Sequence, residues 1–292
     1  MHRALTVTCL VIGAVVVSTG CAAFDRAAKP PAMTLDRIKA TNTISMGYRA
    51  SSVPFSFVGP DGKPAGYSVD LCARVADDLR RELRLPDLEV RWVPVDVSTR
   101  TPALLNGAID LECGSTTNTL TRQEQVDFSL TTFITGGSLL VLGGTDLERE
   151  FRNLRIAVIP GTTTERTLAE MIAKLGPGGV DLIPVKDHGD GLAAVESRAA
   201  DAYASDRAIL IGLVMTSQNP ARFALMNRYF SYEPYALMLR RGDPAFRLAV
   251  NRVLARLYRT GDIESVYRRW FGQMGVPASL LVAMYAIEGL PE

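Results

Sequence analysis

The sequence predicts an α/β fold made of two loosely similar halves. Short runs rich in branched and aromatic residues alternate with helical patterns of roughly 10–15 residues, and this alternation favours parallel sheets covered by helices on both faces. Each half also contains a strand that ends in a glycine followed by hydroxyl residues. The chain has 292 residues, of which 47% are hydrophobic and 22% charged, so it is large enough for one or two well-filled cores.

Hydrophobic periodicity and turn residues place the elements in order. In the first half we expect a strand at 43–49, a hairpin around 59–62, a helix around Cys72, a strand at 88–95, a short helix near 101–107 and a strand at 109–113. In the second half we expect strands at 155–160, 180–185 and 201–205, with helices at 163–176, 189–200 and 207–214. A strand at 235–241 then leads into a C-terminal helix that closes at Gly261.

Two cysteines share apolar faces of neighbouring elements. Cys72 falls on the apolar stripe of its helix, and Cys113 alternates with Ile109 and Leu111 on one face of its strand. Both thiols therefore point toward a core, where an oxidising compartment would allow them to form a disulfide. The alternative is a pair of buried free thiols.

The N-terminus reads as an export signal. Arg3 precedes an apolar run of 14 residues from Ala4 to Val17, which is the usual length of a signal-peptide core and too short to span a bilayer. Small residues before Cys21 resemble a bacterial lipobox, although Ser18 departs from that pattern. We therefore expect a signal peptide at 1–20, lipidation of Cys21 and a tether at 21–33; the alternative is ordinary cleavage near the same position. No later stretch approaches 18 apolar residues, so no transmembrane helix is expected.

The net charge and the small numbers of histidines and cysteines exclude several classes of protein. The formal net charge is +1, without the basic excess of a nucleic-acid-binding protein. Only two His and four Cys are present, and His188 is the one histidine after the signal segment. A multi-histidine or cysteine-rich zinc site is therefore excluded, and we expect neither a metal nor a cofactor.

One turn in each half suits an anion. The strings ECGSTTN (112–118) and IPGTTTE (159–165) each end a strand with glycine, then hydroxyl residues, then a helical pattern. Such a turn directs backbone N–H groups and hydroxyls beyond the carboxyl end of a sheet, where open α/β folds bind ligands. Each turn alone could be an ordinary helix cap. Together they favour an anionic ligand held between two lobes.

Several strings, in this order, resemble the glutamate/aspartate-binding proteins of bacterial ABC importers, within the polar-amino-acid solute-binding family. These strings are TLDRIKATNTISMGYRASSVPFSF, GKPAGYSVDLC, LLNGAIDLECGSTTNTLTRQEQVDFS, PGTTTE and KDHGDG. The resemblance implies the type II periplasmic-binding-protein fold: two α/β lobes, each a mostly parallel sheet flanked by helices, joined by two hinge strands. It places lobe one at 34–138 plus 239–292 and lobe two at 139–238.

The resemblance also implies a site for a dicarboxylate amino acid, whose buried charges each need a partner. Arg122 would take the α-carboxylate with Thr117 and Thr163, and Asp206 would take the ammonium with Ser115. The side-chain carboxylate would lie among Arg49, Arg100 and His188, and a charged His188 would make binding weaken as the pH rises. Val97 replaces the family's serine, with Ser98 and Thr99 beside it.

The implied function is an exported, monomeric binding protein that closes like a flytrap on glutamate or aspartate and delivers it to an ABC permease. It would reside in the periplasm or cell envelope, held to the membrane only by the lipid anchor. One alternative is a dehydratase or lyase on the same fold, which needs a poised acid or base such as His188 or Glu112. Glu112 alternates away from the apolar face of its strand, and Ser115, His188 and Asp187 lack a nucleophile-elbow motif. We therefore expect no enzyme; the other alternative is a ligand-sensing receptor module.

Overall fold

The computed structural model describes residues 33–145, 153–175 and 179–292. The expected signal peptide at 1–20, Cys21 and nearly all of the expected tether lie outside these described residues. Residues 33–292 cluster as one compact unit.

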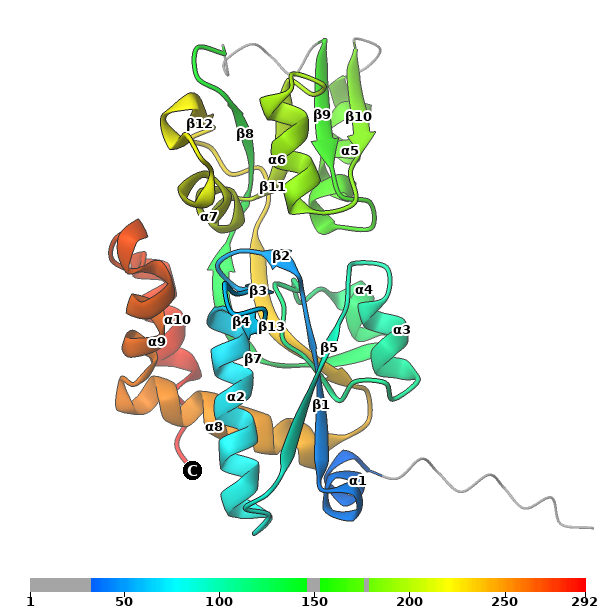
Figure 1. Ribbon diagram of the computed structural model, residues 1–292, viewed down its shortest axis with the longest axis vertical. Coiled ribbons are helices and arrows are strands. Elements are labelled where there is room, and N and C mark those ends of the chain that lie inside the picture. The colour runs from blue at the N-terminus through cyan, green and yellow to red at the C-terminus, as the bar shows by residue number, and fades with distance from the viewer. Residues whose placement is uncertain (1–32, 146–152, 176–178) are drawn as a thin grey trace, which may run out of the picture. The chain divides into compact units, whose positions relative to one another are not determined.

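Two five-stranded sheets organise this unit (Figure 1). The first sheet has the order β5 (Glu89–Pro94), β1 (Thr43–Tyr48), β6 (Leu111–Glu112), β13 (Glu233–Arg240), β7 (Val126–Thr135). The second has the order β10 (Val180–Pro184), β9 (Leu154–Val158), β11 (Ala202–Asp206), β8 (Gly137–Leu142), β12 (Phe223–Leu225). A small third sheet contains β2 (Ser51–Ser52), β3 (Ser56–Val58) and β4 (Pro64–Ala65).

Helices pack on each large sheet, and we call a sheet with its helices a lobe. The first lobe carries α1 (Thr34–Thr41), α2 (Tyr67–Glu82), α3 (Arg100–Leu105), α4 (Leu120–Gln123), α8 (Pro244–Thr260), α9 (Ile263–Phe271), η2 (Gly272–Met274) and α10 (Ser279–Glu288). The second lobe carries α5 (Thr163–Leu175), α6 (His188–Glu196), α7 (Arg207–Thr216) and η1 (Pro220–Arg222).

Each sheet is half parallel and half antiparallel, which is more mixed than the expected mostly parallel arrangement. β1 pairs in parallel with β5 and β6, whereas β13 runs antiparallel to β6 and β7. In the second sheet β9 is parallel to β10 and β11, whereas β8 is antiparallel to β11 and β12. The antiparallel strands are those that carry the chain between the lobes, so they are not part of strand–helix–strand units.

The chain crosses from the first sheet to the second directly, because β7 and β8 are separated only by Gly136 (Figure 1). A Cβ at Gly136 would lie 2.5 Å from the carbonyl oxygen of Ser231, on the segment that returns to the first sheet as β13. Glycine is therefore required where the two crossing segments approach each other. The sequence patterns did not predict β7 or β8.

The C-terminal region contains more helix than the sequence analysis expected. α8 ends where predicted, with Gly261 in the left-handed conformation at φ 79°. Two further helices, α9 and α10, follow it. α9 buries Ile263, Val266, Tyr267 and Phe271, an i, i+3, i+4 pattern that the sequence analysis left unused.

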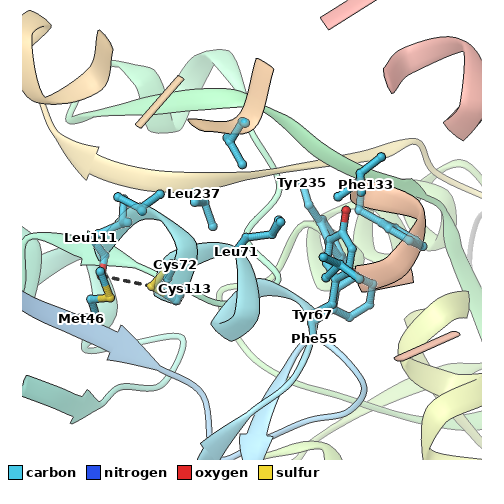
Figure 2. Packing of buried hydrophobic residues seen from close by; sticks show 14 of the residues in the cluster. Met46, Phe55, Tyr67, Leu71, Cys72, Leu111, Cys113, Phe133, Tyr235 and Leu237 are labelled. Carbon is cyan, nitrogen blue, oxygen red and sulfur yellow. Dashed lines mark hydrogen bonds between the residues drawn. A yellow bond between two sulfur atoms is a disulfide. The ribbon is translucent and has the colours of Figure 1, made fainter. Parts of the chain in front are cut away.

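The core of the first lobe combines an aromatic cluster with a disulfide (Figure 2). Phe55 contacts Tyr67, Phe133 and Tyr235, with ring centroids 4.9–6.1 Å apart. Cys72 on α2 and Cys113, which directly follows β6, are joined by a disulfide across a sequence separation of 41 residues. This bond fixes the helix to the strand whose following turn carries part of the site.

Candidate functional site

The residues that the sequence analysis selected for ligand binding come together in one pocket, whose cavity volume is about 30 Å³. All eight line it: Arg49, Arg100, Ser115, Thr117, Arg122, Thr163, His188 and Asp206. The other lining residues are Val97, Ile159, Thr162, Thr164, Tyr203, Ala204, Ser205 and Ile209. The pocket has the convergent polar groups that fix the orientation of a small molecule in a binding site.

The first lobe contributes from the carboxyl ends of its parallel strands, as open α/β sheets do. Arg49 directly follows β1, and its backbone N–H donates to Ser56 Oγ at 2.9 Å. Ser115 and Thr117 lie in the turn after β6. The turn ends at Thr119, whose hydroxyl caps α4 by accepting a hydrogen bond from Arg122 N at 3.2 Å.

Arg122 is held in place by the same turn. Its Nη1 donates to the carbonyl oxygen of Thr117 at 2.7 Å. Burial lowers the pKa of this guanidinium, whereas Glu233 and Glu112 raise it. The group stays charged at neutral pH and still has N–H donors free for an anion.

Arg100, at the start of α3, is buried, and a threonine hydroxyl links its guanidinium to the Glu112 carboxylate. Its Nη1 donates to Thr116 Oγ1 at 2.7 Å, and this hydroxyl donates to Glu112 Oε2 at 2.7 Å. Burial lowers the pKa of Arg100, and the Glu112 carboxylate opposes that effect. Arg49, which is also buried, likewise has its pKa lowered by burial and raised by Glu112.

Glu112 therefore supports the pocket arginines, although it does not itself line the pocket. It alternates away from the apolar face of its strand, yet it is 0% exposed. Its Oε1 has no hydrogen-bond partner within the described residues, and a Cβ at Gly114 would lie 2.2 Å from it. Alternation failed as a signal because this sheet is covered on both faces, so neither face of β6 meets solvent.

The second lobe contributes from the ends of β11 and from two helix N-termini. Thr163 begins α5, and His188 begins α6. Asp187 caps α6, with Oδ1 accepting from Asp190 N at 3.0 Å. This carboxylate is therefore committed to its own helix rather than to orienting His188 for catalysis.

Asp206 ends β11 and is buried. Its Oδ2 accepts a short hydrogen bond from the Tyr235 hydroxyl. Burial, and then the nearby Glu233 carboxylate, raise the pKa of Asp206 to about 7, although the Tyr235 hydroxyl and Arg122 oppose this rise. Asp206 can therefore carry a proton near neutral pH.

His188 is neutral in this site. Burial, and then Arg49, lower the pKa of His188 to about 3, and its Nδ1 lies 2.7 Å from the Tyr203 hydroxyl. A neutral imidazole has one N–H, so it donates from one nitrogen and accepts at the other. The ligand-free protein thus lacks the charged imidazole that the expected loss of binding at high pH requires.

The wall around Val97 is apolar. Ser98 and Thr99 do not substitute for a hydroxyl at this position, because both donate to Asp96 Oδ1, at 2.7 and 3.0 Å. Val97 Cγ1 instead lies 3.4 Å from the Cβ position of Gly161 in the second lobe. Ile159 and Ile209 add further apolar lining.

The described residues contain neither a candidate metal site nor a membrane-spanning helix. Over residues 33–145, 153–175 and 179–292, no cluster of three or more His, Cys, Asp or Glu could hold a metal ion. Among these residues there is also no helix of the length and apolarity needed to cross a membrane.

Two α/β lobes that share a pocket at the ends of their strands define a two-lobed solute-binding protein. Residues 44–273 match the family model of the bacterial extracellular solute-binding proteins, family 3, and the chain belongs to this family. The suspected family and the fold class are thereby confirmed.

Named relatives cover most of the chain. The L-glutamate/L-aspartate-binding protein of Pseudomonas aeruginosa is 39% identical over 251 residues, which span 85% of this chain and 82% of that protein. The glutamate/aspartate import solute-binding protein of Escherichia coli K12 is 36% identical over 270 residues, which span 91% and 89%. Among solved structures, a mutant of ArgBP from T. maritima matches with a TM-score of 0.73 and 25% identity, covering 82% of this chain and 100% of that one.

Proposed function

We propose that this protein is the extracytoplasmic binding component of an ABC amino-acid importer and captures glutamate or aspartate between its lobes. The observation that carries this proposal is the pocket itself, where the buried Arg49 and Arg100, the half-buried Arg122 and one aspartate face a single space. The names of the two relatives identified above support the same class of ligand.

Each charged group of an acidic amino acid has a partner of opposite charge among these residues. We assign the α-carboxylate to Arg122 and the ammonium to Asp206, with Ser115 beside it. We assign the side-chain carboxylate to Arg49 and Arg100, with a neutral N–H from His188. Arginine suits both carboxylates because its planar N–H groups can bind two oxygens at once.

Desolvation explains why the site needs an anionic ligand. Burial lowers the pKa of Arg49, Arg100 and Arg122, so a nearby anion would stabilise the charged form of each guanidinium. A dicarboxylate supplies the missing negative charge when the lobes enclose it. The ligand then stabilises the closed form, because it binds that form more tightly than the open form.

We further propose that the lobes, at 34–138 plus 239–292 and at 139–238, close about the two crossing connections. The closed protein would deliver its ligand to the membrane subunits of a permease as a monomer. The proposal includes export through the segment at 1–20 and lipidation of Cys21, with no catalytic role for the chain.

A thermal-shift panel with glutamate, aspartate, glutamine, asparagine, arginine and histidine tests the ligand class. A ligand at 100 times its Kd adds about 2.7 kcal/mol of stability, which is readily measured. We expect shifts with glutamate or aspartate and smaller ones with the neutral amides. The absence of any shift with the two acids would reject the proposal, and consumption of the ligand would indicate an enzyme instead.

Two arginine variants test the assignment of the carboxylates. Arg122→Ala should abolish binding of every amino acid, because every one carries the α-carboxylate. Arg100→Ala should mainly lose the preference for acidic over neutral side chains. Arg228→Ala, at an exposed arginine outside the pocket, is the matched control and should bind normally. Normal glutamate binding by both pocket variants would show that the assignment is wrong.

A further inference from the structure

A buried carboxylate that does not line the pocket controls two hydroxyls that do. Glu233 begins β13, where the chain returns to the first sheet, and it is 1% exposed. Its Oε1 accepts from Ser231 Oγ at 2.6 Å. Its Oε2 accepts from Thr117 Oγ1 at 2.6 Å and from Thr163 Oγ1 at 2.7 Å.

The two threonines come from different lobes. Thr117 lies in the turn after β6 in the first lobe, and Thr163 begins α5 in the second. One oxygen of Glu233 therefore accepts a hydrogen bond from each lobe at the edge of the pocket. These two bonds can form together only when the lobes are in the arrangement seen here.

The direction of these hydrogen bonds limits what the hydroxyls can do for a ligand. A threonine hydroxyl has one proton to donate and two lone pairs to accept with. Both protons are already donated to Glu233, so both hydroxyls face the pocket as acceptors. Their oxygens are 3.4 Å apart, which lets one cationic group contact both. A carboxylate cannot use such oxygens, because it has no proton to give them.

We propose that Glu233 is a positioning residue that turns Thr117 and Thr163 into acceptors for the ligand's ammonium group, beside Asp206. This inference rests on the proposed function and deepens it. Arg122 then binds the α-carboxylate. Asp206 and the two hydroxyl oxygens accept hydrogen bonds from the ammonium group. Glu233 thereby makes the site select amino acids over diacids that lack the amine.

The experiment compares ligands that differ only in the amine. Glutamate is paired with glutarate, and aspartate with succinate, and each Kd is measured by competition calorimetry on the full chain. The variants are Glu233→Gln, Thr163→Val and the two combined. A glutamine at 233 can accept from the hydroxyls only through one amide oxygen, and its N–H groups would donate toward them.

We expect Glu233→Gln to reduce the preference for the amine-bearing ligand by about tenfold or more, the value of one hydrogen bond to a charged group. Thr163→Val should lose a similar factor, because it removes one acceptor. The double variant should lose less than the product of the two factors, since both changes act on the same contact. Thr163→Val keeps the test decisive if Glu233→Gln does not fold.

Three outcomes would overturn the inference. One is an unchanged preference in both single variants. A second is tighter binding of both members of a pair by Glu233→Gln, which would mean that the hydroxyls donate to a ligand carboxylate once Glu233 is gone. A third is full additivity in the double variant. The wild-type measurement separates this inference from the proposed function, because a wild type that binds neither acid rejects that function first.

Discussion

Acidification should weaken ligand binding, and Asp206 is the reason. This carboxyl group is buried, and the Glu233 carboxylate is near it. Burial and the charge of Glu233 together raise the pKa of Asp206 to about 7. A protonated Asp206 cannot balance the ligand's ammonium, so the ligand selects the ionised form. Each ligand bound below pH 7 must then release a proton from Asp206.

The size of the effect follows from that pKa. With a ligand-free value of about 7 and an ionised bound form, the affinity should be about tenfold lower at pH 6 than at pH 8, and about ninetyfold lower at pH 5 than at pH 8. The charged His188 that the sequence analysis expected gives the opposite sign, with binding lost as the pH rises. One titration therefore distinguishes the two residues.

The assay is calorimetry between pH 5 and 8 in two buffers with different ionisation enthalpies, which reports both Kd and proton release. At pH 6 we expect release of about 0.9 proton per ligand bound. Asp206→Asn should bind weakly and lose the pH dependence, whereas His188→Gln should keep it. Affinity that is constant, or that rises toward pH 6, would refute the assignment.

The stability of the protein without ligand independently tests the raised pKa of Asp206, because that pKa fixes the direction in which stability changes with pH. An unfolded aspartate has a pKa near 3.9, so between about pH 4 and pH 7 only the unfolded state releases this proton. The folded state should therefore lose stability as the pH rises through this window, by about 4 kcal/mol in order of magnitude. Asp206→Asn should remove that slope.

Two further predictions concern the scaffold. Replacing Cys72 and Cys113 together by serine should cost about 4 kcal/mol of stability, because the disulfide closes a 41-residue separation; equal denaturation midpoints of the variant and the wild type would contradict this. A Cβ at Gly212 on α7 would lie 2.6 Å from the Val53 carbonyl oxygen of the other lobe, so Gly212→Ala should hinder closure and weaken ligand binding about tenfold or more. Gly272→Ala should bind normally, because Gly272 has a helical φ of −55° and a Cβ added there would meet no neighbouring atom within 4 Å.

Elements with a strong local pattern were predictable. The stripe on α8 and the left-handed Gly261 are local features, and α8 ends at that glycine. β7 and β8 were not predicted, because their strand character depends on pairing with segments about 80 to 110 residues away in sequence. The register and the pairing partners of such strands cannot be predicted from the residues next to them in sequence.

The arginines, the threonines and Asp206 could be named because the family resemblance of the chain implies a binding role for each of them. The sequence analysis named Glu112 only as a possible acid or base of an enzyme, and it did not name Glu233, because nothing adjacent in the chain distinguishes Glu233 from a surface acid. Their roles depend on hydroxyls or guanidiniums brought to them by folding. The proton on Asp206 and the neutrality of His188 depend in the same way on burial.

The sequence by itself determined the α/β class, the family resemblance and which residues could carry charge in the pocket, because these depend on composition and on short motifs. The tertiary structure decided the protonation of those residues and the direction of their hydrogen bonds. The physical reason is that desolvation and the field of distant charges act through space, between groups far apart along the chain.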